Sequence, residues 1–81
     1  MPRYYFDVSD GAELFIDDDG MELPDMPTAI GEARRALADM MRDSLRADGA
    51  DAVSIAIRDG ADGPVIISVN LTTVHPDNTK P

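Results

Sequence analysis

The chain has 81 residues, no cysteine and a formal net charge of −9, from 16 acidic and 7 basic residues. A chain of this length holds one small core, and without cysteine it forms neither disulfides nor thiolate metal sites. Its acidic balance repels phosphate backbones at long range and therefore disfavours nucleic-acid partners. No segment approaches the roughly 20 apolar residues that span a bilayer, so we expect a cytoplasmic protein without membrane contact.

The first segment, residues 3–17, predicts a β-hairpin. Residues 3–8 alternate in polarity, which is the period-two pattern of a half-buried strand. The Ser-Asp-Gly sequence at 9–11 then favours a tight reversal. Leu14 and Ile16 follow as a short second strand, and we expect both side chains on the core face.

The next segment, FIDDDGMELPD at residues 15–25, is the strongest candidate for a metal site. An EF-hand loop aligned on its glycine needs carboxylates at its first and twelfth positions, where this chain has Phe15 and Met26. The EF-hand interpretation therefore fails. A weak divalent-cation site at Asp17, Asp19 and Glu22 stays open, and its alternative is a hydrated acidic turn.

Residues 26–47 predict an amphipathic helix, because apolar side chains recur at steps of three and four. Asp25 is well placed to cap its first turn, and Gly49 to end it. Arg34 falls at the edge of the apolar stripe, either covering the core with its methylene groups or binding a carboxylate or phosphate of a partner. Arg34 and Arg35 together are the candidate polar contact site.

After the helix, alternation at residues 53–58 and 65–74 predicts two more strands, separated by the turn sequence DGADGP. The expected architecture is α+β, a two-layer ββαββ domain in which one helix packs on one face of a four-stranded antiparallel sheet. Residues 1–74 form this single domain, and the polar segment 75–81 is expected to be disordered.

The other face of the expected sheet carries three apolar side chains among its polar ones, at Tyr5, Phe15 and Ile66. Apolar side chains gathered on an open face suggest an interface. A two-layer domain also leaves a sheet edge unpaired. We therefore expect binding to another protein or to a second copy of the chain as a homodimer.

Enzymatic motifs are absent from the sequence. His75 is the single histidine, and without cysteine it cannot complete a zinc site. No serine lies in a nucleophile motif, and no glycine-rich loop for phosphate is present. We expect a domain that is not an enzyme and uses no cofactor.

Three motifs in order resemble short bacterial proteins classified only as a domain of unknown function. They are an M-P-x-Y-x-F strand, a D-x-x-G-x-E-x-x-D turn and an alanine-rich helix with E-A-x-x-A. The matching residues are Pro2, Tyr4 and Phe6; Asp17, Gly20, Glu22 and Asp25; and Glu32, Ala33 and Ala36. The resemblance implies a cytoplasmic bacterial protein without an assigned activity.

A hairpin followed by Leu-Pro-Asp at 23–25 and an E-A helix is also similar to HicB-type antitoxin domains. That similarity implies a protein that neutralises a small RNA-cleaving toxin. The chain departs from the family because the F-P-D-L-P-G turn is missing, two strands follow the helix in place of a DNA-binding segment, and the chain is acidic. An acidic surface that covers a basic toxin would nevertheless suit its charge. From the sequence, our main hypothesis is a protein-interaction or regulatory module. A cation-binding domain and a HicB-like antitoxin are its alternatives.

Overall fold

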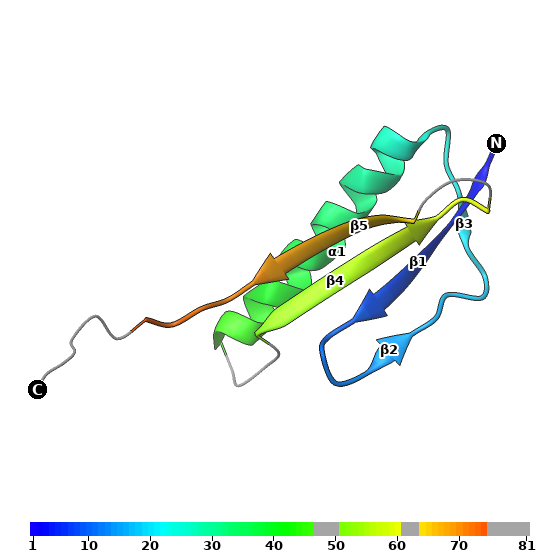
Figure 1. The fold of residues 1–81 in the computed structure, drawn as a ribbon. Helices are drawn as coiled ribbons and strands as arrows, with labels where there is room; N and C mark the ends of the chain where they lie inside the picture. The colour runs from blue at the N-terminus through cyan, green and yellow to red at the C-terminus, as the bar shows by residue number, and fades with distance from the viewer. Residues whose placement is uncertain (47–50, 61–63, 75–81) are drawn as a thin grey trace, which may run out of the picture.

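The computed structural model describes residues 1–46, 51–60 and 64–74, and within them the domain is α+β with a single helix. Figure 1 shows this helix packed on one face of an antiparallel sheet and running in much the same direction as the strands. The expected helix stop at Gly49 and the tail 75–81 lie outside the described residues. The elements in chain order are β1 (Arg3–Ser9), β2 (Leu14–Phe15), β3 (Met21–Glu22), α1 (Met26–Arg46), β4 (Ala52–Arg58) and β5 (Val65–Asn70).

The sheet has five strands in the described part of the chain, one more than the four expected. Its order is β2-β1-β4-β5, and β3 also pairs with β1. The two-residue strands β2 and β3 pair with opposite ends of β1, at Val8–Ser9 and Arg3–Tyr4 respectively. The expected hairpin therefore continues through an acidic turn into a third short strand, which gives βββαββ where ββαββ was predicted.

The core lies between α1 and the inner sheet face, centred on β4. Four helix residues spaced four apart are buried, namely Ala29, Ala33, Leu37 and Met41. The two alanines are almost fully covered, which lets the helix backbone come close to the sheet. Opposite them Ile55 and Ile57 are fully buried, and each contributes about 1.5–3 kcal/mol by leaving water. Tyr4 and Val53 complete the buried set.

The helix begins where the sequence predicts. Oδ1 of Asp25 accepts hydrogen bonds from the backbone N–H of Thr28 at 2.9 Å and from the Thr28 hydroxyl at 2.6 Å. These bonds confirm Asp25 as the N-cap, since a cap satisfies an N–H group that has no partner inside the helix. Among the described residues, no helix is both long and apolar enough to cross a bilayer.

The second strand departs from the expectation. Leu14 and Ile16 are 62% and 55% exposed, so their predicted place in the core is wrong. The register explains the difference, because Leu14 pairs with Ser9, whose side chain alternates away from the helix. The chain then leaves the sheet after Phe15, and Ile16 belongs to the turn.

Candidate interaction site

The two edges of the sheet differ in regularity and in charge. On one edge β2 and β3 have two residues each, and an acidic turn separates them. On the other edge β5 pairs with β4 without interruption from Ala52↔Asn70 to Ile57↔Val65, and its far side meets no strand in the described part of the chain. The sequence of β5 is VIISVN, which contains no charge, glycine or proline. Proteins usually blunt such an edge with charges, bulges or short strands.

The helix leaves the inner face of β5 partly uncovered. Val53 on β4 and Val69 on β5 are paired across the two strands, yet they are 4% and 36% exposed. The difference arises because α1 packs mainly over β4. Between the helix and β5 there remains a groove, which we call the α1/β5 groove, with a volume of about 390 Å³. Its lining residues are Arg34, Leu37, Ala38, Met41, Ile67, Ser68 and Val69.

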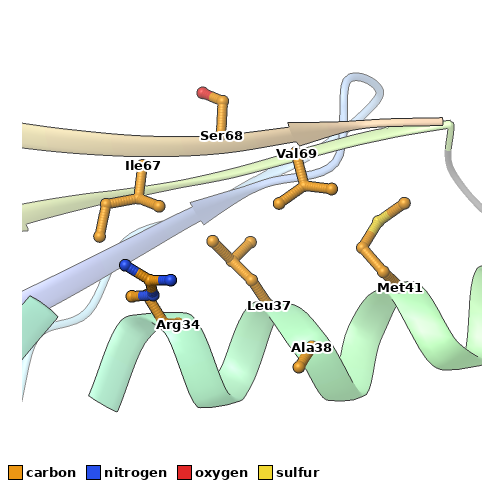
Figure 2. A pocket seen from close by; sticks show the side chains of 7 residues that line it. All are labelled: Arg34, Leu37, Ala38, Met41, Ile67, Ser68 and Val69. Atoms are coloured by element: carbon orange, nitrogen blue, oxygen red, sulfur yellow. The ribbon is translucent and has the colours of Figure 1, made fainter. Parts of the chain in front are cut away.

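Figure 2 shows how this groove is built. The side chains of Leu37 and Met41 rise from the helix, and those of Ile67 and Val69 point from the strand toward them. Ser68 points to the opposite face of the sheet. The interior is therefore apolar, and residues on alternate positions of β5 supply its upper wall.

Of the two arginines predicted as a polar contact site, only Arg34 lines the groove. Its guanidinium extends along the groove beneath Ile67 (Figure 2) and makes no ion pair or hydrogen bond with the described residues. Arg35 instead forms an exposed ion pair with Glu32 one turn earlier on the helix. The structure thus places one of the two side chains at the groove and the other in an ion pair on the solvated face.

The three apolar residues predicted on the outer sheet face do not form one patch. Tyr5 and Ile66 do share that face, on strands separated by β4. Phe15 pairs with Val8, which packs against the core, so Phe15 lies toward the helix side. The guanidinium of Arg58 also lies over the ring of Tyr5, with its Cζ 4.9 Å from the ring centroid. Ile66 therefore remains the exposed apolar residue beside the β5 edge, at 64% exposure.

At the acidic turn, the Asp17 carboxylate binds backbone N–H groups. Its Oδ1 accepts from Asp19 and Gly20, each at 3.0 Å, and its Oδ2 accepts from Phe6 at 3.0 Å. These bonds, led by that from Gly20, hold the pKa of Asp17 below its usual value against the opposing effect of burial. Asp17 closes the turn and joins it to β1.

The other two predicted metal ligands are directed elsewhere. The guanidinium of Arg3 donates to Glu22 Oε2 at 3.2 Å and to the backbone carbonyl of Asp19 at 2.8 Å, while the Asp19 side chain is exposed. The described residues contain no group of three His, Cys, Asp or Glu side chains arranged to hold a metal ion. The structure does not bring Asp17, Asp19 and Glu22 together as a ligand set.

A polar cluster that was not predicted from the sequence joins β1, β4 and the acidic turn. Arg58 donates from Nε to Asp7 Oδ2 at 2.7 Å and from Nη2 to Asp7 Oδ1 at 3.1 Å, and also to the Asp17 carbonyl at 3.0 Å. Asp7 in turn accepts from the Asp17 N–H at 3.0 Å. The hydrogen bond from Arg58 lowers the pKa of the buried Asp7 carboxyl. Alternation does place Asp7 and Arg58 on the outer face, and their opposite charges were the available signal.

The fold and its edges define a small two-layer α+β domain, with one sheet edge closed by an acidic turn and the other left regular and uncharged. Residues 3–72 match the family model described as domain of unknown function (DUF6894), so the chain belongs to this family. The match confirms the resemblance to a domain of unknown function. No curated protein and no solved structure matches the chain significantly.

Proposed function

We propose that this domain is a non-enzymatic protein-interaction module that binds an extended segment of another polypeptide at the β5 edge. The observation that carries the proposal is the combination of an uncharged edge strand, whose outer side pairs with no strand in the described part of the chain, with an apolar groove directly beneath it. An added strand would take its hydrogen bonds from the edge and insert alternate side chains into the groove, as in β-strand addition.

The residues of the α1/β5 groove fit this mode of binding. Ala38, Ile67 and Val69 offer apolar surface that an incoming side chain would remove from water, at roughly 25 cal/mol per Å². Arg34, which has no ion-pair partner among the described residues, offers hydrogen-bond donors to an acceptor group of the incoming polypeptide. This arrangement favours a strand with apolar residues at alternate positions.

The polar cluster supports a binding domain more than a catalytic one. Asp7, Asp17 and Arg58 satisfy one another and the backbone of the turn, as expected of groups that hold strands together. In the described residues, no buried side-chain nitrogen or oxygen lacks a hydrogen-bond partner. The cluster therefore needs no substrate to complete its hydrogen bonding.

Two matched substitutions on the helix test the proposal. Ala38 and Ala36 are both exposed on α1, and Ala38 lines the α1/β5 groove while Ala36 lines the hollow on the opposite flank of the helix. Arginine has a high helix propensity, so both Ala38→Arg and Ala36→Arg preserve α1. Ala38→Arg fills the groove and is expected to abolish binding, whereas Ala36→Arg is expected to retain it.

The measurement is affinity capture of each tagged variant from a lysate of the protein's own cells, with quantitative mass spectrometry of the bound proteins. The proposal expects a polypeptide, including an untagged copy of this chain, that wild type and Ala36→Arg recover and Ala38→Arg does not. Equal recovery by both variants, or loss with Ala36→Arg alone, would contradict binding at this groove.

A further inference from the structure

We propose that the strand bound at the β5 edge is β5 of a second copy of this chain, which extends the sheet across a two-fold axis. This inference rests on the proposed function, because it names the polypeptide that occupies the same edge. Its three supports are the distribution of charge, the position of exposed apolar side chains and the register that symmetry allows.

Charge is distributed so that copies of this acidic chain can meet at β5. Residues 64–74 contain no charged side chain, in a chain whose net charge is −9. The opposite edge carries the acidic residues Asp10, Glu13, Asp17, Asp18, Asp19 and Glu22 on or next to β2 and β3. Pairing β5 with β5 places the two acidic edges at the far ends of the combined sheet, where their mutual repulsion is weakest.

Exposed apolar side chains surround the same edge on both faces of the sheet. Ile66 is exposed on the outer face, Val69 on the inner face, and Leu45 on the helix. Leu45 follows Met41 by one turn, so it continues the apolar side of the helix that borders the groove. One symmetric contact covers all three residues, because the second copy presents the same residues in return.

Symmetry leaves few registers for the paired strands. An antiparallel seam relates the copies by a two-fold axis perpendicular to the sheet, which puts both helices on the same face. Side chains directly opposite one another across the seam point to the same face of the sheet. One residue must therefore lie directly opposite the same residue of the other copy, and the axis passes between those two residues. The strands overlap over most of their length only if this self-paired residue lies near the middle of β5. The two middle residues are Ile67 and Ser68, so one of them is the self-paired residue.

The structure favours the axis at Ser68. In this register the small Ser68 lies opposite its own copy on the outer face, and Ile67 lies opposite Val69 of the other copy above the groove. An axis at Ile67 would instead bring together the two Arg34 guanidinium groups that lie beneath that residue (Figure 2). The Ser68 register separates these like charges along the strands.

Cysteine substitution tests both the partner and the register, because the natural chain contains no cysteine. Opposed residues of an antiparallel pair have Cα atoms about 4.5–5.5 Å apart, within the range of roughly 4.4–6.8 Å that a disulfide spans. Ser68→Cys is therefore expected to form a disulfide-linked dimer on mild oxidation. Two Ile66→Cys residues would lie four strand positions apart, about 14 Å, which is too far for a bond.

The closing experiment combines light scattering of the purified chain with oxidation of Ser68→Cys, Ile66→Cys and the control Leu14→Cys. Leu14 lies on the opposite edge and is as exposed as Ile66, at 62% and 64% respectively. The inference expects a wild-type mass of twice 8.7 kDa, rapid crosslinking of Ser68→Cys alone, and a monomeric Ser68→Lys. A wild-type monomer overturns the inference, and so does crosslinking of Ile66→Cys or Leu14→Cys that equals that of Ser68→Cys.

These outcomes are separate from those that test the proposed function. A purified monomer excludes the second copy as the bound strand. The capture experiment with Ala36→Arg and Ala38→Arg still decides whether the groove binds another polypeptide.

Discussion

The carboxylate of Asp17 occupies the place of a missing strand beside Phe6. Strand β1 pairs with β3 through Arg3–Tyr4 and with β2 through Val8–Ser9, and its middle lies between these two short pairings. There Asp17 Oδ2 accepts the backbone N–H of Phe6 at 3.0 Å. One side chain thus satisfies a backbone donor that a continuous strand would otherwise bond.

The first prediction concerns the stability that Asp17 supplies. Asp17→Asn retains one oxygen acceptor and turns an amide group toward backbone N–H donors, so we expect the free energy of unfolding to fall by about 1–3 kcal/mol. Urea denaturation followed by circular dichroism measures this change. The neighbouring exposed Asp18→Asn is the control, with an expected change within roughly 0.5 kcal/mol. Equal effects of the two substitutions would refute the structural role of Asp17.

A second prediction contrasts two glycines. At Gly20, which has φ of +74°, an added Cβ would lie 2.8 Å from Arg3 Cγ and from Tyr5 Cε2, and at the helical Gly31 it would meet nothing within 4 Å. Gly20→Ala is therefore expected to destabilise the fold by roughly 1–3 kcal/mol. Gly31→Ala is expected to stabilise it by about 0.5–1 kcal/mol. Thermal unfolding of both variants checks the opposite signs, and a neutral Gly20→Ala would contradict the close packing of the turn.

Periodicity in the sequence was sufficient to predict the main elements. Apolar residues at four-residue spacing specify the buried side of α1, and Asp25 marks its start through a bond to Thr28 only three residues away. Alternation likewise identifies β1, β4 and β5 and the inner residues of β4, although the last strand was predicted to reach residue 74 and ends at Asn70. These features depend on neighbours in sequence, so a single sequence suffices to find them.

The features that were missed depend on residues distant in sequence. Only part of the role of Asp17 is local: its Oδ1 bonds to Asp19 and Gly20 lie within three residues, whereas its Oδ2 bond is to the N–H of Phe6, 11 residues earlier. The pair of Arg58 with Asp7 spans 51 residues. The α1/β5 groove depends on strand order and on the helix lying over β4, which no period in the sequence encodes.

The third prediction concerns the two hydrogen bonds that the guanidinium of Arg58 donates to Asp7. Its Nε donates to Asp7 Oδ2 and its Nη2 donates to Asp7 Oδ1 and to the Asp17 carbonyl. Lysine keeps the charge and loses this geometry, so Arg58→Lys is expected to lower the urea midpoint clearly. Arg42→Lys, in an exposed pair with Asp39 one turn apart, is expected to change it very little. Equal midpoints for the two variants would show that charge alone suffices at position 58.

The fourth prediction addresses calcium at the acidic turn. Both oxygens of Asp17 already accept N–H groups, and Glu22 is paired with Arg3. A cation would have to displace these bonds, so millimolar calcium is expected to leave the melting temperature unchanged. A ligand that binds only the folded state raises that temperature. A rise in wild type that disappears in Asp19→Asn would therefore establish the cation site that the sequence suggested.

The last prediction is a loss of stability in acid. Hydrogen bonds from Arg58 to Asp7, from Gly20 to Asp17 and from Thr28 to Asp25 lower the pKa of each carboxyl from its ordinary value of 3.8. Each group thus binds its proton more weakly in the folded chain than in the unfolded chain.

The stabilisation from these carboxylates is therefore complete above the unfolded pKa, near 3.8, and is lost as the pH falls through the folded values below it. Urea midpoints measured from neutral pH down to about pH 2 are expected to be level at first and to decline below pH 4. Asp7→Asn removes one of the three carboxylates. The urea midpoint of this variant is therefore expected to be lower than that of wild type at neutral pH and to fall less steeply in acid. A wild-type midpoint that stays level below pH 4 would contradict the stabilising role of these carboxylates.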